Sequence, residues 1–449
     1  MKDLYLKFIA SSGICTDSRN ITQGCIYFAL KGTSFDGNTF AEEALLKGAL
    51  YAVIDNPLLK TSDKMIVVDD VLTTLQQLAN YHRKTHKTLV IAITGSNGKT
   101  TTKELIKAVL SEAFNVTATK GNLNNHIGVP LTLLSIKPET DIAIVEMGAN
   151  HLNEIAFLCS IVEPDYGYIT SIGKAHLEGF GSFEGVMKTK GELYQYLKEH
   201  NKTIIVNNND KIQRQLIGDY PNVYSFGDTP EVNVMVRYER TNPAEVSFGD
   251  TSVAEVYDEL GEKLQHSEIE GFSSAVTQVK SHLTGSYNFS NIAAAIAFGK
   301  FFKLSSEAIK RGIEQYIPNN NRSQIIKQGS NTILLDAYNA NPSSMTEAIN
   351  NIRTITDFTK KVLILGDMFE LGDYASIEHQ NIVNLIQQTP WEAVFLVGEN
   401  FAKTQSNYLT FNTFEDFKKV FSQYNFSDTL LLIKGSRGMA LERLLEGKI

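Results

Sequence analysis

The chain has 449 residues, 43% of them hydrophobic and 20% charged, and its formal net charge is −8 at pH 7. These values are typical of a folded protein of roughly three domains, at about 150 residues per domain, and they exclude a disordered chain. The negative charge argues against nucleic acid or an anionic membrane surface as the main partner, while small anionic ligands stay compatible with it. No stretch approaches the ~18 apolar residues that a membrane span needs.

The three cysteines, Cys15, Cys25 and Cys159, show neither metal-ligand spacing nor an even pairing. This predicts reduced thiols and a cytoplasmic location. At the N-terminus, Asp3 and Lys7 interrupt any apolar core that a signal peptide would need. We therefore expect a cytoplasmic monomer that neither inserts into membranes nor binds nucleic acid.

Apolar runs alternate with helical patterns along the chain, which predicts an α/β fold with mostly parallel sheets. Polar residues gather at 81–87 and 316–324, and we divide the chain there into domains 1–84, 85–316 and 317–449. The expected strands are 88–95, 141–148, 165–173 and 203–208 in the central domain, and 331–338, 361–368, 393–398 and 428–435 in a Rossmann-like C-terminal domain. Antiparallel, exposed hairpins are expected within 228–282.

A glycine-containing loop, "ITGSNGKTTTKE" at 93–104, follows the first central strand. It ends like a phosphate loop, G-x-x-x-x-G-K-[ST], but Ile93 stands where that pattern has its first glycine. Gly95 and Gly98 provide a shorter turn that still directs backbone N–H groups and a helix N-terminus at a phosphate. The residues expected to bind ATP here are Gly95, Ser96, Asn97, Gly98, Lys99, Thr100 and Thr101.

Side chains of this loop and of the next central strand suit phosphate and Mg²⁺. Lys99 is placed to reach the outer phosphates, and Thr100 or Thr101 to help hold Mg²⁺. Glu146 ends the expected strand 141–148, where its carboxylate can face the loop across parallel strands. Mg²⁺ prefers such oxygen ligands together with phosphates and waters.

The last third of the chain places polar residues near expected strand ends, in "NNNRSQ", "LLDAYNANPSSM" and "LIKGSRGMALE". Open α/β sheets bind ligands beyond the carboxyl ends of their strands. The candidates for ATP are Arg322, Asp336 and Asn339, and those for an incoming substrate are Lys434 and Arg437.

Taken together these motifs resemble the Mur ligase family. The short loop TG-x-[NT]-GKTT is the form that this family carries, and folylpolyglutamate synthetases share it. The resemblance runs from about residue 14 to 443 and includes "TDSR" at 16–19, "GNLNNHIGVPLTLL" at 121–134 and "GSYNFSN" at 285–291. It implies three domains: a small N-terminal α/β UDP-binding domain, a central P-loop-type parallel-sheet domain and a C-terminal Rossmann-like domain. Asn38 and Tyr287 depart from the family pattern, in which histidine is common.

Further roles come from the resemblance. By this resemblance His176 is a Mg²⁺ ligand, and Lys190 aligns with a lysine that the family carries as a carbamate. The carbamate is a carboxylate-like ligand for Mg²⁺, whereas a free ammonium would be repelled by the metal ion. Asn288 and Asn291 would contact the nucleotide. The implied metal ligands are Thr100, Glu146, His176 and Lys190, and the catalytic group is Lys99 with Glu146, His176 and Lys190. The implied substrate-binding residues are Ser18, Arg19, Asn125, Thr132, Lys434 and Arg437.

The elements "YNANP" and "GDM-x-ELG" resemble the branch of the family that adds D-alanyl-D-alanine to UDP-N-acetylmuramoyl-tripeptide. This implies ATP-dependent amide formation with Mg²⁺, through an acyl phosphate and without a side-chain nucleophile. Two alternatives stay open. A sibling ligase would add diaminopimelate or glutamate, and a nucleotide-dependent switch or scaffold would hydrolyse ATP or GTP without any added amine.

Overall fold

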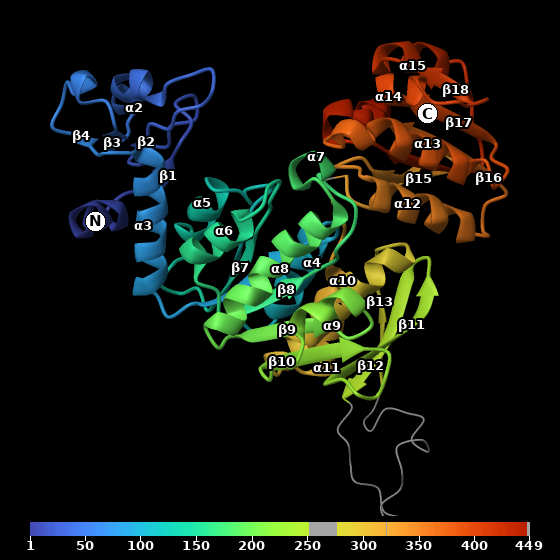
Figure 1. The fold of residues 1–449 in the computed structure, drawn as a ribbon, viewed down its shortest axis with the longest axis horizontal. Coiled ribbons are helices and arrows are strands. Elements are labelled where there is room, and N and C mark those ends of the chain that lie inside the picture. The colour runs from blue at the N-terminus through green and yellow to red at the C-terminus, as the bar shows by residue number, and fades with distance from the viewer. Residues whose placement is uncertain (251–275, 320, 447–449) are drawn as a thin grey trace, which may run out of the picture.

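The computed structural model describes residues 1–250, 276–319 and 321–446. These residues form three sheets that follow one another along the chain, and Figure 1 shows them as three lobes. The predicted α/β architecture with mostly parallel sheets is confirmed. Within the described residues, no helix is both long and apolar enough to cross a membrane.

The N-terminal lobe is a four-stranded parallel sheet in the order β1-β2-β3-β4, accompanied by α1, α2 and α3. Asp70 begins α3 because its side chain accepts a hydrogen bond from the backbone N–H of Thr73 at 2.6 Å. The elements are α1 Lys2–Ile9, β1 Ile14–Cys15, β2 Ile26–Phe28, α2 Ala41–Leu46, β3 Tyr51–Ile54, β4 Met65–Val67 and α3 Val71–Thr85.

The central lobe is a nine-stranded sheet in the order β13-β12-β11-β10-β9-β8-β5-β7-β6. The pairs β11–β12 and β12–β13 are antiparallel, and the other strand pairs of this sheet are parallel. Its strands are β5 Leu89–Thr94, β6 Val116–Ala118, β7 Ile142–Glu146, β8 Tyr166–Ile169, β9 Thr203–Asn207, β10 Val223–Gly227, β11 Val234–Thr241, β12 Ala244–Asp250 and β13 Thr277–Lys280. Its helices are α4 Lys99–Leu110, α5 Gly128–Leu133, α6 Glu154–Val162, α7 Leu177–Phe180, α8 Phe183–Glu199, α9 Lys211–Ile217, α10 Phe289–Phe301 and α11 Ser306–Gln315.

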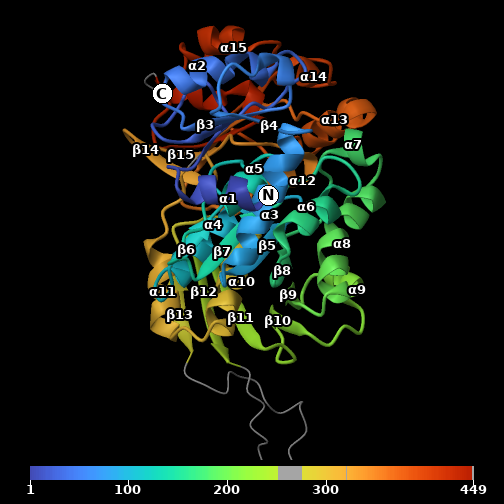
Figure 2. The same ribbon diagram turned by 90° about the vertical axis from the view of Figure 1, so that its left-hand side faces the viewer.

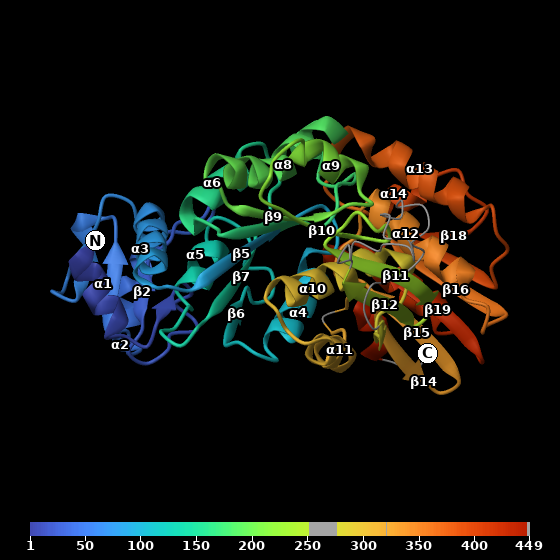
Figure 3. The same ribbon diagram turned by 90° about the horizontal axis from the view of Figure 1, so that it is seen from below.

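Helices cover both faces of this central sheet, as Figure 3 shows. Strand β5 alternates between them: Val90 and Ala92 pack with α6 and α8, while Ile91 and Ile93 pack with α4 and α10. A strand buried on both faces reads as a continuous apolar run, which is why this element was visible in the sequence. The carboxyl end of β5 and the start of α4 therefore lie at the same end of the sheet.

The C-terminal lobe is a six-stranded sheet in the order β14-β15-β19-β16-β17-β18, parallel except for β14. Its strands are β14 Gln324–Gln328, β15 Asn331–Asp336, β16 Lys360–Gly366, β17 Ala393–Val397, β18 Leu409–Phe411 and β19 Thr429–Lys434, and its helices are α12 Pro342–Thr354, α13 Ala375–Ile386, α14 Glu399–Ala402 and α15 Phe414–Phe421. Figure 2 shows the molecule from its N-terminal side, with the C-terminal lobe behind the N-terminal one.

Two sequence predictions need correction. Residues 170–173 are not strand, since β8 ends at Ile169. The predicted hairpins in 228–282 do pair antiparallel, but the strands β11 and β12 bury one face against α10; the part from 251 to 275 lies outside the described residues. The domain boundaries at 84 and 316 stay predictions.

Candidate active site

A cleft of about 1040 Å³ is lined by residues of both the central and the C-terminal lobe. Loop residues 96–101 form part of its wall, together with Glu146 at the end of β7. The opposite wall comes from the ends of β15 and β19. The cleft therefore lies where parallel strands of two sheets end, the usual position of a ligand site in such folds.

The loop between β5 and α4 depends on two glycines. Gly95 and Gly98 have φ angles of 147° and 80°, which side-chain-bearing residues rarely adopt. A Cβ atom at Gly98 would also lie 2.5 Å from Oδ1 of Asn291. Helix α4 begins directly after this turn, at Lys99, so the partial positive charge of its N-terminus faces the cleft.

Lys99 lies at the first turn of α4, where its Nζ donates to the carbonyl oxygens of Gly95 (2.7 Å) and Ser96 (3.2 Å). Burial lowers the pKa of Lys99, and the charge of Arg322 acts in the same direction, while the carboxylate of Glu146 raises it. Arg322 belongs to the C-terminal lobe, so cations from two lobes face the same part of the cleft. Such a site favours a multiply charged anion.

Glu146 is almost fully buried and faces the loop. Its two carboxylate oxygens accept hydrogen bonds from the hydroxyl of Thr100 (2.9 Å) and the side-chain amide of Asn124 (2.8 Å). A hydroxyl and a buried carboxylate beside a phosphate loop fit Mg²⁺, which usually takes only one or two protein ligands plus phosphates and waters. Within the described residues there is no cluster of three or more His, Cys, Asp and Glu side chains suited to a metal. Asn124 was not expected from the sequence.

His176 also lines the cleft, but it faces the other lobe. Its Nδ1 pairs with a carboxylate oxygen of Glu370, which precedes α13 in the C-terminal lobe. This contact with His176 lowers the pKa of Glu370. The structure thus gives His176 a partner across the cleft, and its role as a Mg²⁺ ligand stays a prediction.

Lys190 lies beneath the cleft wall on α8 and is 1% exposed. Its Nζ donates to the carbonyl oxygen of Ala149 at 3.2 Å and lies 5.2 Å from the centre of the Phe180 ring. Burial, and next to it the charge of Lys99, hold the pKa of Lys190 well below its ordinary value. Both effects favour loss of the ammonium proton, and the uncharged amine is the form that can add CO₂.

Asn288 and Asn291 lie at the start of α10 and line the cleft. The Asn291 amide donates to Oδ1 of Asn288 at 2.9 Å, and Oδ1 of Asn291 accepts from the hydroxyl of Thr102 at 2.9 Å. The two asparagines thus share one face, as their spacing indicated, and Asn291 contacts α4 just after the phosphate loop. Their contact with nucleotide stays a prediction.

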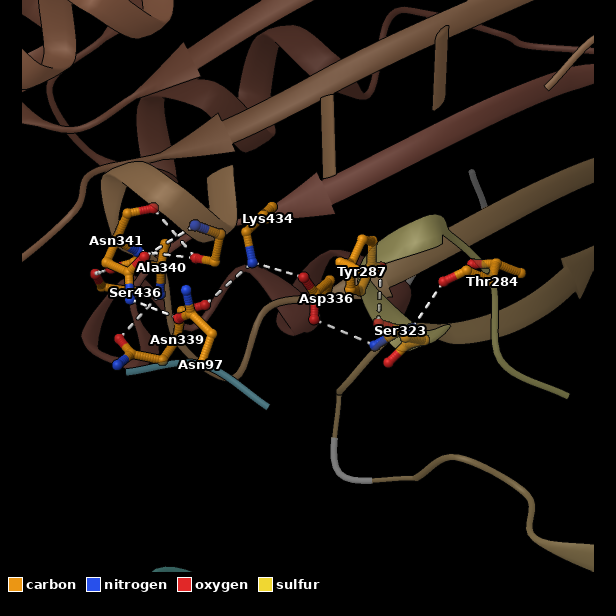
Figure 4. A network of polar contacts seen from close by, with 12 residues as sticks. Asn97, Thr284, Tyr287, Ser323, Asp336, Asn339, Ala340, Asn341, Lys434 and Ser436 are labelled. Atoms are coloured by element: carbon orange, nitrogen blue, oxygen red, sulfur yellow. Dashed lines mark hydrogen bonds and ion pairs between the residues drawn. The ribbon is translucent and has the colours of Figure 1, made fainter. Parts of the chain in front are cut away.

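The strand ends of the C-terminal lobe carry a buried ion pair, which Figure 4 shows. Nζ of Lys434, at the end of β19, lies 2.6 Å from Oδ2 of Asp336, at the end of β15, and 3.3 Å from the carbonyl oxygen of Asn339. The other oxygen of Asp336 accepts from the backbone N–H of Ser323 at 3.2 Å. Lys434 is only 2% exposed but lines the cleft, and its contact with substrate stays a prediction.

The central and C-terminal lobes contact each other directly at the phosphate loop. The side-chain amide of Asn341, which caps α12, donates to Oδ1 of Asn97 at 2.7 Å, and Figure 4 shows the two residues side by side. The loop is also held from the central lobe by Ser171, whose hydroxyl accepts from the backbone N–H of Asn97 at 3.0 Å. Ser171 lies in the stretch 165–173 that was predicted to be strand, two residues beyond the end of β8.

The predicted substrate residues are divided between the lobes. Arg437 and Asn125 line the cleft, and Oδ1 of Asn125 accepts a hydrogen bond from the backbone N–H of Gly128 at the start of α5. Thr132 is buried and donates to the Gly128 carbonyl within its own helix, so its side chain does not line the cleft. Ser18 and Arg19 belong to the N-terminal lobe, where the exposed Arg19 pairs with Asp17 at 2.9 Å.

Three family models match the chain in the order of its lobes. They are the Mur ligase family catalytic domain at residues 11–83, the Mur ligase middle domain at 93–299, and the Mur ligase glutamate ligase domain at 321–437. A Bacillus subtilis protein named UDP-N-acetylmuramoyl-tripeptide–D-alanyl-D-alanine ligase is 34% identical, over 97% of this chain and 93% of its own. The chain belongs to the Mur ligase family. An Escherichia coli protein of the same name is 32% identical, over 97% of this chain and 93% of its own.

Solved structures of this family agree with the fold. MurF from Acinetobacter baumannii superimposes with a TM-score of 0.82 at 29% identity, covering 96% of this chain and 92% of that one. MurF ligase from Thermotoga maritima, solved in complex with ADP, gives a TM-score of 0.82 at 26% identity, covering 99% and 98%. The three-lobed arrangement of this Mur ligase is therefore that of solved family members along nearly its whole length.

Proposed function

We propose that this Mur ligase is an ATP-dependent amide ligase that joins D-alanyl-D-alanine to UDP-N-acetylmuramoyl-tripeptide, giving the pentapeptide precursor of peptidoglycan. The names of its full-length relatives support this substrate pair, and the ADP complex of a similar structure supports a nucleotide site. The single observation that carries the proposal is the shared cleft: Lys99 at the phosphate loop and Arg437 beyond β19 line the same cavity. A ligase needs its phosphoryl donor and its amine in one place.

The chemistry follows from the residues of that cleft. The terminal carboxylate of the tripeptide attacks the γ-phosphorus of ATP and displaces ADP. The dipeptide amine then attacks the carbonyl carbon of the resulting acyl phosphate, which forms the amide and releases phosphate and a proton. Lys99 and the N-terminus of α4 offset the charge on the transferring phosphoryl group. Arg322 lines the same cleft as Lys99. No side-chain nucleophile is needed.

Thr100 and Glu146 are the side chains best placed to hold Mg²⁺, which would neutralise phosphate charge when bound. Lys190 is proposed to act as its carbamate, supported by the burial of its amine, which lowers its pKa. The amine attacks CO₂ and loses a proton, leaving a carboxylate-like group on the lysine. The cytoplasmic location, the monomeric state and the UDP contacts of Ser18 and Arg19 are part of the same proposal.

A substrate panel tests the function. Purified protein is incubated with ATP, Mg²⁺ and UDP-N-acetylmuramoyl-tripeptide carrying either diaminopimelate or lysine at its third position, and product is detected by mass spectrometry. We expect amide product with D-alanyl-D-alanine and none with diaminopimelate or glutamate as the added amine. Product with one of those amines instead would show a sibling ligase, and strong ATP or GTP hydrolysis without any amine would show a switch.

Arg437→Ala tests the amine side of the cleft. The planar guanidinium suits the carboxylate of the dipeptide, which it can bind with two parallel hydrogen bonds. We expect KM for D-alanyl-D-alanine to rise roughly tenfold or more, since losing a hydrogen bond to a charged group costs about 1.5–3 kcal/mol. Affinity for ATP, titrated calorimetrically without dipeptide, should change little. An unchanged kcat and KM for the dipeptide would contradict this assignment.

A further inference from the structure

One aromatic ring of the cleft contacts two arginines from different segments of the C-terminal lobe. Tyr338 follows β15, and the guanidinium carbon of Arg322 lies 3.7 Å from the centre of its ring. The guanidinium carbon of Arg437 lies 4.9 Å from the same centre. Arg322 precedes β14 and Arg437 follows β19, so the ring joins the beginning of the lobe to its end.

Both arginines line the cleft. The charge of Arg322 reaches Lys99, whose pKa it lowers, and its buried Nε has no hydrogen-bond partner among the described residues. Arg437 is exposed and lines the cleft where the dipeptide carboxylate is proposed to bind. Arg322 is thus available to a phosphate, and Arg437 to the second substrate.

Two guanidinium groups beside one ring repel each other, while the negative π face of the ring attracts each of them. The position of the ring consequently affects both cations. A phosphate that binds Arg322 offsets its charge and fixes it against Tyr338. This removes part of the repulsion that Arg437 experiences and leaves the ring in place to hold it.

We propose that Tyr338 is a positioning residue that couples the nucleotide to the dipeptide, because it holds Arg322 and Arg437 on a shared ring. The inference rests on the proposed function, which supplies the two ligands. Binding of either ligand then favours binding of the other by the same factor, as linkage requires. The phenol oxygen is not needed for this role, whereas the ring is.

The test measures this factor directly by calorimetry. A non-hydrolysable ATP analogue with Mg²⁺ is titrated into full-length protein holding UDP-N-acetylmuramoyl-tripeptide, with and without saturating D-alanyl-D-alanine. The variants are Tyr338→Leu, which removes the ring, and Tyr338→Phe, which keeps it. Tyr424→Leu is the matched control, since it removes a 39%-exposed ring of the same lobe that packs on Phe395 and does not line the cleft.

We expect the dipeptide to tighten analogue binding roughly fivefold or more in the wild-type protein and in Tyr338→Phe and Tyr424→Leu, a usual size for coupling between sites. In Tyr338→Leu the factor should fall towards one while the melting temperature stays near that of Tyr424→Leu. A wild-type factor in Tyr338→Leu, or its loss in Tyr338→Phe, would overturn the inference. Wild-type protein that shows no coupling but turns over the dipeptide overturns the inference alone; no coupling and no turnover overturn the proposed function as well.

Discussion

At the scale of single residues, Lys99 is the side chain on which the chemistry most depends. It is the cation of the phosphate loop itself, at the first turn of α4 and in contact with the loop carbonyls. We expect Lys99→Ala to lower kcat/KM by more than the ~10²-fold that is typical of removing one electrostatic stabiliser. The measurement is steady-state kinetics with circular dichroism as the check on folding. Near-normal turnover at saturating ATP would refute the assignment of the loop.

The sequence indicated the loop and the strand-end residues because their positions follow from short-range rules. A glycine turn between a strand and a helix, or a polar residue just after an apolar run, needs only local sequence to be recognised. Asn124 and Ser171 were missed because their partners, Glu146 and Asn97, are brought close only by the tertiary fold.

At the scale of elements, α3 joins the N-terminal lobe to the central one through His82. Its Nε2 lies 2.9 Å from the carbonyl oxygen of Ile136, in the central lobe, and its Nδ1 lies 3.3 Å from the hydroxyl of Tyr5. The His86 ring lies 4.4 Å from the His82 ring. Burial, and to a lesser extent the charge of His86, lower the pKa of His82. The neutral His82 ring donates through Nε2 to Ile136 and accepts through Nδ1 from Tyr5, so protonation of the ring disturbs these contacts.

The sign of the pH effect follows from the lowered pKa. As pH falls below the ordinary value of 6.5, the unfolded chain takes up a proton that folded His82 resists, so the free energy of unfolding decreases. His82→Gln keeps a donor towards Ile136 but does not titrate. We expect the wild-type melting temperature to fall by about 2–4 °C more than that of His82→Gln between pH 7.5 and 5.5. His200→Gln, at an exposed histidine, is the control, and parallel slopes for wild type and His82→Gln would contradict the prediction.

Element length explains which parts of the fold were visible in the sequence. The core strands β5, β7, β16 and β19 are five to seven residues long, and buried on both faces they appear as apolar runs. The N-terminal strands have only two to four residues, too few for any period to emerge. The hairpin β11–β12 was recognised as antiparallel but not as part of the central core, since its apolar face is defined only by contact with α10.

At the scale of the whole molecule, a small set of polar contacts holds the C-terminal lobe over the phosphate loop. Nζ of Lys174, beyond β8, lies 2.7 Å from a carboxylate oxygen of Glu378 on α13. The backbone N–H of Lys174 donates to the hydroxyl of Ser343 at 3.0 Å, and Asn97 contacts Asn341 nearby. A closed arrangement of this kind keeps water from an acyl phosphate and completes a site that is divided between lobes.

Breaking the Lys174–Glu378 pair should therefore impair dipeptide use more than nucleotide binding. Lys174 is half-exposed while Glu378 is buried, and pairs of this kind contribute about 0.5–1 kcal/mol, so we expect Lys174→Ala to raise KM for D-alanyl-D-alanine roughly two- to fivefold. Affinity for ATP, which the loop of the central lobe largely determines, should stay near the wild-type value in calorimetric titration.

The swapped pair Lys174→Glu with Glu378→Lys should recover part of the loss, because attraction between the lobes is restored. Lys188→Ala, an exposed lysine on α8 of the same lobe, is the matched control for lost charge. If Lys174→Ala left KM unchanged, or if the swapped pair were worse than either single variant, the ion pair would have no part in holding the lobes together.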